Sequence, residues 1–311
     1  MSCCDDSKVI ALPSGEQLCN KHFSEYFESK VFRTIRQYNL LDKQEQLGVA
    51  LSGGKDSIVV LSLLKKLTEE NPNITVTALL IDEGIHGYRN KTMETAKAFC
   101  ENNNVPLHIF SYESEFGMPL DTMLQVMSIK PCSLCGVFRR YLLNKKSKEL
   151  GFTKLATGHN LDDECQSILM NQFKNNMQAS ARLGPKVGIK ENKQFVQRIK
   201  PLYLCSEKEV ATYAFINNLL ADFSECPNVA KSYRAQVRDM LNNFEMQFPG
   251  TKFAIVNSLL EILPELKERF KGAEINVCQE CGEAAAKDIC KACTFIRQLK
   301  NRSRTVLPIV H

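Results

Sequence analysis

The sequence predicts an α/β fold with a parallel sheet, followed by a helical segment and flanked by terminal zinc-binding modules. From about residue 46, apolar runs alternate with amphipathic stretches, as in a parallel sheet covered on both faces. After roughly residue 225 the pattern is helical, and the end of the chain is rich in cysteine. We expect four parts: an N-terminal zinc-finger-like segment and helix over 1–45, a nucleotide-binding catalytic domain over 46–225, a helical segment over 226–274, and a C-terminal zinc ribbon with a basic tail over 275–311.

Strands and helices alternate regularly in the α/β part. Strands are expected at Leu47–Leu51, Thr75–Ile81, Pro106–Tyr112 and Lys154–Thr157. Helices are expected at Ser57–Leu67, Lys91–Asn103, Gly136–Leu150 and Asp162–Asn175. In the helical segment, Pro249-Gly250 separates two further helices, Ser232–Phe248 and Lys252–Phe270.

Composition and charge narrow the class of protein. The 311-residue chain has no run of about 18 apolar residues, and its N-terminus has no secretion-signal pattern, so we expect a cytoplasmic protein. The net charge of +5 says little, but Lys and Arg concentrate in residues 137–148, residues 174–200 and the last 25 residues. Each stretch alone fits a solvated surface, whereas together they suit a folded polyanion such as RNA.

The most informative segment is Ser52-Gly53-Gly54-Lys55-Asp56-Ser57, which lies between a buried strand and a helix. Free N–H groups at a helix N-terminus bind phosphate, and glycine lets the main chain approach it. The spacing is not that of a Walker loop. An ordinary strand-to-helix turn is the alternative. We interpret the segment as an ATP-binding loop with Ser52, Gly53, Gly54, Lys55, Asp56 and Ser57 as its ligands.

Two other loops follow strands and should meet this one. Ligands of parallel sheets bind beyond the carboxyl ends of the strands. We therefore add Asp82, Gly158, His159 and Asp163 to the ATP site, although His159 also fits a purely structural role in its loop. Asp56 and Asp163 are suited to hold Mg²⁺ on the triphosphate. For Asp162 and Glu164, capping of the following helix is an equally good explanation.

Thirteen cysteines without a secretion signal indicate metal or redox chemistry rather than disulfides. Two Cys-x-x-Cys pairs close the chain and predict one tetrahedral zinc site with no open position, formed by Cys278, Cys281, Cys290 and Cys293. A second zinc site is suggested near the N-terminus by Cys3, Cys4, Cys19 and His22, although adjacent cysteines are unusual in such a site. Three isolated cysteines, Cys100, Cys165 and Cys205, are expected in the core.

A further pair, Cys132 and Cys135, opens a helix at a spacing that puts both sulfurs on one face. The helix dipole and the nearby Arg139 and Arg140 are expected to lower the pKa of both thiols. Cys226 lies at the junction with the helical segment, from where it can return to the crevice. Three thiolates can hold an iron–sulfur cluster with one iron open. A persulfide-carrying Cys132–Cys135 pair and a third structural zinc are the alternatives.

The glycine loop resembles that of the PP-loop ATP pyrophosphatases, which have an adenine nucleotide α-hydrolase-like fold. Together the motifs resemble those of the tRNA 2-thiouridine synthetases, the two-zinc-finger branch of that superfamily. The resemblance spans nearly the whole chain and is carried by residues 51–57, 81–85, 132–140, 157–164 and 225–227 with the final cysteines. The adjacent Cys3 and Cys4 depart from that family's N-terminal Cys-x-x-Cys.

The resemblance implies a tRNA sulfurtransferase. Such enzymes use ATP and Mg²⁺ to adenylate the C2 oxygen of a uridine, and sulfur then displaces AMP with the help of a [4Fe-4S] cluster on residues matching Cys132, Cys135 and Cys226. We assign catalytic roles to these cysteines and to Asp56, Arg139 and Asp163. The run from Cys135 to Arg140 is similar to that of the branch acting on wobble uridine 34 rather than uridine 54.

Several alternatives stay open at the level of sequence. A noncatalytic RNA-binding protein with zinc ribbons would bind tRNA without cleaving ATP, and an amidating ligase of the same superfamily would leave the three cysteines without a role. The sulfur donor can be a ubiquitin-like carrier thiocarboxylate, free sulfide or a desulfurase. Because members of the family are typically dimers, the resemblance also implies a homodimer.

Overall fold

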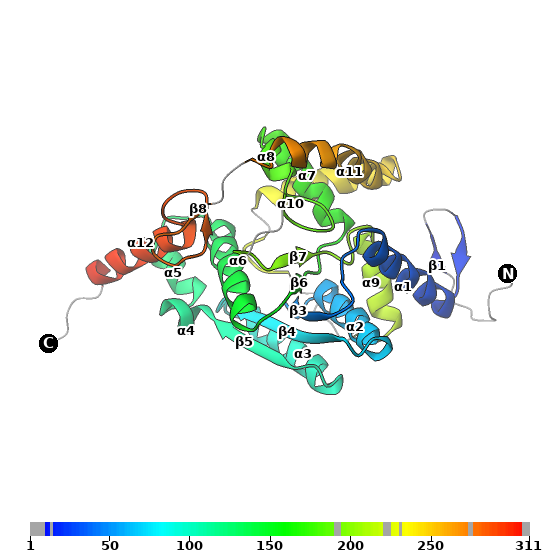
Figure 1. Cartoon of the computed structure of the whole chain (residues 1–311), viewed down its shortest axis with the longest axis horizontal. Helices are drawn as coiled ribbons and strands as arrows, with labels where there is room; N and C mark the ends of the chain where they lie inside the picture. Colours follow the sequence, from blue (N-terminus) through cyan, green and yellow to red (C-terminus); the bar gives the residue numbers. More distant parts are fainter. Residues whose placement is uncertain are drawn as a thin grey trace.

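The computed structural model describes residues 10–12, 15–189, 194–219, 225–229, 232–272 and 276–306. Its centre is a parallel five-stranded sheet in the order β5-β4-β3-β6-β7 (Figure 1). The strands are β3 (Glu45–Ala50), β4 (Ile74–Asp82), β5 (Leu107–Ser111), β6 (Lys154–Ala156) and β7 (Gln197–Ile199). The chain leaves β3 to one side for β4 and later returns to β3's other side as β6. The switch point, where parallel sheets bind ligands, is therefore between β3 and β6.

Helices cover both faces of the sheet because alternate residues of each strand point to opposite sides. Along β4, Val76, Ala78 and Leu80 pack into one core, while Leu79 and Ile81 pack into another. The first core lies under α1 (Asn20–Gln37), α2 (Lys55–Glu70), α3 (Arg89–Asn102) and α9 (Glu207–Ile216). The second lies under α4 (Tyr112–Phe116), α5 (Leu120–Val126), α6 (Pro131–Glu149) and α12 (Lys291–Val306).

A third core joins α7 to the helical segment beside the β7 edge of the sheet. Leu161, Cys165 and Ile168 of α7 pack with Val237 and Leu241 of α10 and with residues of α11. This group comprises α7 (Leu161–Phe173), α8 (Met177–Ser180), α10 (Tyr233–Gln247) and α11 (Thr251–Arg269), and Figure 1 shows it as one layer at the top of the molecule. Within the described part of the chain, no helix is both long and apolar enough to cross a lipid bilayer.

Two small antiparallel hairpins flank the α/β body. The first pairs β1 (Ile10–Ala11) with β2 (Gln17–Leu18) just before α1. The second pairs β8 (Asn276–Val277) with β9 (Ala284–Ala285) and carries the first two C-terminal cysteines on its loop. Most of the expected basic tail forms the helix α12, whose Phe295 ring packs edge-on to Phe138 of α6 at 6.1 Å.

All four expected strands and all six expected helices are present, with ends shifted by a few residues. The cysteine-bearing helix begins at Pro131 because proline at the first helical turn loses no hydrogen bond. The sequence analysis did not place β7 or α9. Cys100, Cys165 and Cys205 are buried, as expected.

Candidate active site

The glycine loop forms the predicted strand-to-helix turn at the end of β3. Its hydroxyl groups hold the loop together: Ser57 Oγ donates to the Gly54 carbonyl at 2.9 Å and accepts from the Ser52 N–H at 3.1 Å. Gly53 has φ +83°, and an ideal Cβ there would lie 1.9 Å from the carbonyl oxygen of Thr92. The loop is thus tightly fitted against α3 and leaves the start of α2 facing the crevice.

Charged side chains surround the start of α2. Lys55 Nζ lies 3.2 Å from Asp56 Oδ2 and 2.9 Å from Oε1 of Glu207 at the start of α9. Burial lowers the pKa of Lys55, but the two carboxylates more than compensate and raise it above its usual value. Lys55 is therefore a fixed cation at the place where we expect the phosphates.

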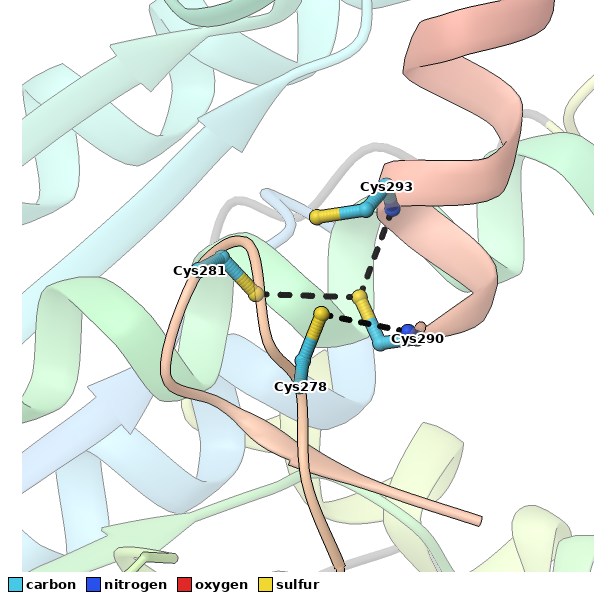
Figure 2. A group of neighbouring side chains, drawn as sticks. All are labelled: Cys278, Cys281, Cys290 and Cys293. Carbon is cyan, nitrogen blue, oxygen red and sulfur yellow. Dashed lines mark hydrogen bonds between the residues drawn. The ribbon is translucent and has the colours of Figure 1, made fainter. Parts of the chain in front are cut away.

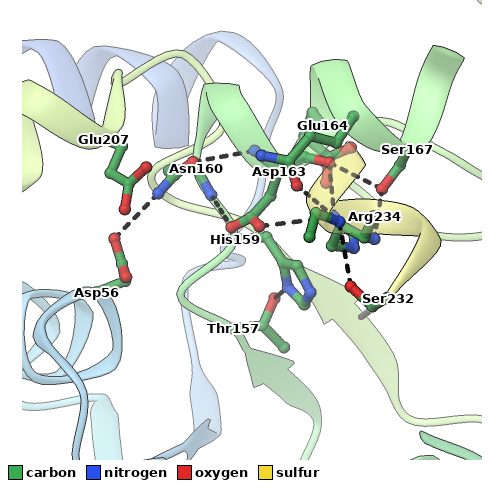
Figure 3. A network of polar contacts seen from close by, with 12 residues as sticks. Asp56, Thr157, His159, Asn160, Asp163, Glu164, Ser167, Glu207, Ser232 and Arg234 are labelled. Carbon is green, nitrogen blue, oxygen red and sulfur yellow. Dashed lines mark hydrogen bonds and ion pairs between the residues drawn. The ribbon is translucent and has the colours of Figure 1, made fainter. Parts of the chain in front are cut away.

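The loop after β6 approaches the glycine loop closely. An ideal Cβ at Gly158 would lie 2.9 Å from the backbone of Asp56 and Ser57, so only glycine permits this spacing. Asn160 Nδ2 donates to Asp56 Oδ1 at 3.0 Å, and its Oδ1 accepts from the N–H of Asp163 at 3.1 Å (Figure 3). The structure thus brings the two predicted Mg²⁺ ligands, Asp56 and Asp163, to the same asparagine.

The cap of α7 differs from the expectation. Asn160 and Asp163 form a reciprocal capping box. The capping offered as an alternative role for Asp162 and Glu164 is thus performed by other residues, although both acids lie in the first turn of α7. Asp162 is buried, pairs with Lys252 of α11 and accepts the N–H of Glu207 at 2.7 Å. Glu164 is buried in an ion pair with Lys200 at 2.6 Å. Both acids serve packing between elements because a buried carboxylate needs a partner.

Asp163 and His159 line the crevice, where the surrounding protein desolvates them although Asp163 is a third exposed and His159 is exposed. Desolvation raises the pKa of Asp163 to about 6 despite Arg234, whose Nη1 is 3.7 Å from it. Desolvation also lowers the pKa of His159 well below its ordinary value, and surrounding cations add to the effect. His159 Nδ1 is 2.9 Å from Thr157 Oγ1. This contact fits the structural role, and a neutral imidazole can also face a nucleotide.

A cavity of about 190 Å³ opens where these groups meet. Among its lining residues are the acidic Asp56, Asp162, Asp163 and Glu207, together with Arg234 and Arg238. Such an excess of carboxylates would repel a triphosphate unless a divalent cation stood between them. The lining therefore fits nucleotide bound with Mg²⁺. Asp82 lies at the end of the neighbouring strand, where its Oδ1 accepts the N–H of Gly84 at 2.8 Å and shapes the turn.

The three predicted cluster cysteines lie near one another at the start of α6. Cys132 lies in the first turn of α6, and its Sγ is 3.4 Å from the carbonyl oxygen of Asn228, two residues after Cys226. Cys226 packs with Cys135 against the second core. The all-thiol donor set is that preferred by iron–sulfur clusters, so the residues present fit such a cluster.

The expectation of a lowered thiol pKa was wrong for Cys135. Burial raises its pKa, and Arg139 offsets this only in part. Burial likewise raises the pKa of Cys226. Tyr112 is fully buried and donates its hydroxyl to the Cys135 carbonyl at 2.7 Å, which fixes this turn of the helix. Desolvation of the thiol, which depends on tertiary packing, outweighs the charge pattern read from sequence.

A buried ion pair connects the glycine loop to the cysteine helix. Arg89 donates to the Ser52 carbonyl at 2.8 Å, and its Nε lies 3.0 Å from Glu83. Glu83 Oε1 in turn lies 3.6 Å from Nη1 of Arg139 on α6. The loop and the helix are thereby linked through Glu83, and the Arg139 side chain stays half-exposed.

The C-terminal cysteines form a compact four-sulfur cluster (Figure 2). The Sγ atoms of Cys278, Cys281, Cys290 and Cys293 all lie within 4.8 Å of one another. Although burial opposes it, backbone N–H groups including that of Cys290 lower the pKa of Cys278 to about 6, whereas burial raises that of Cys281 to about 11. Four thiolates this close require a cation, so the site fits one tetrahedral zinc ion.

The N-terminal site is only partly described. Cys19 is buried, and its Sγ lies 3.2 Å from Nδ1 of His22. Cys3 and Cys4 lie outside the described residues. The second zinc site therefore stays a prediction.

Several residues of the site were not found from the sequence. Glu207, Arg89 and Arg234 each reach the crevice from a distant element. The Gly-Tyr-Arg run at 87–89 follows the Asp82 loop and offered the only local signal. No local sequence signal marks Glu207 or Arg234, because their contacts depend on how α9 and α10 dock.

A model of the PP-loop domain matches residues 24–244. The chain belongs to the PP-loop family. The tRNA 2-thiolation protein NcsA of Haloferax volcanii is 35% identical, and the alignment covers 96% of this chain and 98% of the relative. The tRNA-5-methyluridine(54) 2-sulfurtransferase of Pyrococcus horikoshii is 39% identical over 89% of this chain and 87% of its own.

A solved structure supports the same PP-loop assignment. The U34-tRNA thiolase NcsA from Methanococcus maripaludis, with its [4Fe-4S] cluster, superposes with a TM-score of 0.81 at 33% identity and 96% coverage of both chains. The resemblance to the tRNA 2-thiouridine synthetases and the predicted fold class are thus confirmed. These PP-loop relatives are sulfurtransferases and tRNA thiolation proteins by name.

Proposed function

We propose that this protein is a cytoplasmic, ATP-dependent tRNA-uridine 2-sulfurtransferase. The observation that carries the proposal is the joining of two sites in one crevice. The Cys226 segment contacts Cys132 at the start of α6, and the Glu83–Arg89 pair connects that helix to the glycine loop. A noncatalytic tRNA-binding protein would need neither the loop nor the three thiols beside it.

The glycine loop, with Asp56 and Asp163, would carry out the nucleotide half of the reaction. The N–H groups at the start of α2 and Lys55 would hold the phosphates, while Asp56 and Asp163 would hold Mg²⁺. The uridine O2 would attack the α-phosphorus of ATP, and pyrophosphate would leave. Because O2 is then part of an AMP ester, it becomes a good leaving group.

Cys132, Cys135 and Cys226 would serve the sulfur-transfer half of the reaction. A bound [4Fe-4S] cluster would be held by Cys132, Cys135 and Cys226 and would supply an open iron position for sulfide. A sulfide equivalent from a carrier thiocarboxylate or free sulfide would add at C2, and AMP would depart with the original oxygen. Arg139, half-exposed between Glu83 and the cysteines, would stabilise the negative charge that develops at this step.

We infer that the target is uridine 34, with uridine 54 as the alternative. Relatives of both kinds match this chain. The favouring feature is the run from Cys135 to Arg140, which resembles that of the wobble-uridine branch, whereas the other branch more often has lysine near position 139. We further propose structural zinc at Cys278, Cys281, Cys290 and Cys293, a tRNA partner, and a homodimer.

Replacement of one cysteine tests the proposal. Cys226→Ala should lose iron and thiolation activity in anaerobically purified protein but retain zinc at the C-terminal cysteines. Cys100→Ala, which removes a buried thiol remote from the crevice, is the matched control and should retain all three properties. Metal analysis and nucleoside mass spectrometry of tRNA provide the measurements. Full iron content or full thiouridine yield in Cys226→Ala would contradict the assignment.

The same assay distinguishes thiolation at uridine 34 from thiolation at uridine 54. Wild-type protein is incubated with ATP, a sulfide source and unmodified tRNA, and the product is digested into fragments. We expect thiouridine in the anticodon-loop fragment. Thiouridine confined to the T-loop fragment would overturn the choice of position but not the chemistry.

A further inference from the structure

Basic side chains gather in the crevice between the cysteines and the nucleotide site. Those from α6 are exposed, whereas Arg198 is half-buried on the edge strand β7. Their closeness follows from their mutual electrostatic effects, since His159 is influenced by four of them and Arg198 by two. The group consists of Arg139, Arg140, Arg198, Lys200 and Arg234.

Three members of this group have a carboxylate partner. Arg139 pairs with Glu83 at 3.6 Å, and Arg234 pairs with Asp163 at 3.7 Å. Lys200 pairs with Glu164 at 2.6 Å. Their charge is therefore at least partly neutralised within the protein itself.

Arg140 and Arg198 differ in this respect. Nη2 of Arg198 donates to the Arg140 carbonyl oxygen at 3.2 Å, which places Arg198 directly against α6. An ideal Cβ at Gly136 would lie 3.1 Å from Nη1 of Arg140, so this guanidinium folds back along the helix toward Cys135. Among the described residues, no carboxylate lies within ion-pair distance of either arginine.

This arrangement is unfavourable for the protein alone. Burial and the nearby charges of Arg140 and Arg139 lower the pKa of Arg198 to about 10. Burial and Arg139 also lower the pKa of Arg140. A multivalent anion between the two guanidinium groups would relieve the repulsion, and phosphate matches guanidinium geometry well.

We propose that Arg140 and Arg198 bind a backbone phosphate of the RNA substrate and so seat the target uridine between the glycine loop and the cysteines. The inference rests on the proposed function and identifies the site on this chain that recognises the RNA. It requires no additional cofactor.

RNA fits better than the phosphates of ATP. The nucleotide site already has its own donors in the N–H groups of the first turn of α2 and in Lys55, on the α2 side of the crevice. The arginine pair lies on the cysteine side, on α6 and β7.

The test measures binding of an unmodified tRNA transcript over a series of salt concentrations, with magnesium and ATP held constant. Each lost phosphate contact should lower the salt-dependence slope by about 0.7 to 0.9 and weaken binding about tenfold at 0.1 M salt. We expect this loss for Arg140→Ala and for Arg198→Ala, with partial recovery in Arg140→Lys. Arg33→Ala removes an exposed helical arginine from α1 and should leave tRNA binding unchanged.

The ATP dissociation constant of each variant distinguishes the two sources of phosphate. We expect it to stay within about twofold of wild type. Weakened ATP binding with unchanged tRNA binding would overturn the inference and assign the pair to the nucleotide. Wild-type salt slopes in both alanine variants would overturn it as well.

Failure of the inference can be told from failure of the proposed function. If wild-type protein thiolates tRNA and both alanine variants bind that tRNA as tightly as wild type, only the phosphate site is wrong. If wild-type protein binds tRNA but forms no thiouridine with ATP, iron and sulfide supplied, the proposed function is wrong, whatever the variants bind.

Discussion

The nucleotide loop depends on a single residue that cannot carry a side chain. Gly53 combines a φ of +83° with a backbone neighbour 1.9 Å from its ideal Cβ position. Gly250, at the turn between α10 and α11, has φ +93° but nothing within 4 Å of that position. The two glycines thus share backbone strain but differ in available space.

Alanine at each position should separate these effects. Gly250→Ala should lower the free energy of unfolding by about 1 kcal/mol, the usual effect of alanine in the left-handed region. Gly53→Ala adds a clash with backbone and should cost about 2 to 4 kcal/mol and weaken ATP binding at least tenfold. Urea denaturation and ATP titration are the measurements. Equal effects of the two substitutions would contradict this account of the loop.

The raised pKa of Asp163 has a consequence for stability. In the folded state the carboxyl titrates at about 6 instead of 3.8. Between these values the folded chain holds a proton that the unfolded chain has lost, so raising the pH through this window lowers stability, and the loss persists above it. Because Asp163 is a third exposed, we expect an effect of about 1 kcal/mol rather than the full shift.

The substitution Asp163→Asn removes this titration. With no nucleotide and a chelator present, wild type should lose more stability than Asp163→Asn between about pH 4 and 6, measured as the change in urea midpoint. Comparing slopes rather than absolute stabilities removes the effect of the altered capping box. Parallel pH profiles for the two proteins would show that Asp163 does not titrate in this range.

At the scale of elements, sequence reasoning succeeded where the signal is local. The strand at 47–51, the glycine turn and the helix after it follow from hydrophobic periodicity and glycine chemistry over neighbouring residues. It failed for β7 and α9: Gln197-Arg198-Ile199 is too short and polar to resemble a buried strand. The role of Glu207 at Lys55 is set by the docking of α9 on α2, which no local pattern encodes.

The C-terminal cysteine hairpin contributes to the fold beyond the zinc site proposed for it. Cys278, Cys290 and Cys293 share a core with Leu134 and Phe138 of α6, the helix that carries Cys132 and Cys135. Loss of the metal should therefore loosen α12 from α6. The hairpin would thereby stabilise the position of α6 and of the two cysteines at its start.

Cys293→Ser tests this support. We expect one fewer zinc ion per chain and a free energy of unfolding lower by about 2 to 4 kcal/mol, because a structural metal contributes directly to folding. Cys100→Ala should keep all zinc and cost only about 1 kcal/mol. Metal analysis and urea denaturation give both values. Retention of zinc by Cys293→Ser would remove this cysteine from the site.

At the scale of the whole molecule, three cores meet at one crevice. The sheet core positions the glycine loop, the α6 core positions Cys132 and Cys135, and the α7–α10–α11 core positions Asp163 and Arg234. The contacts that join them, from Ser52 through Arg89 and Glu83 to Arg139, lie within one chain. Each chain should therefore carry a complete active site even within a dimer.

This completeness leads to a prediction about mixed variants. Asp56→Ala should remove the nucleotide half of the site and Cys226→Ala the sulfur half, so each protein alone should be inactive. After mixing under conditions that exchange subunits, thiolation should remain absent, because no chain in the mixture has both halves. A site shared between chains would instead regain activity in the mixed dimer. Nucleoside mass spectrometry distinguishes the outcomes, and exchange itself is checked with differently tagged chains. Restored activity would mean that the active site combines residues of two subunits. The contact between Cys132 and the Asn228 carbonyl within one chain would then not be sufficient to form the sulfur half of the site.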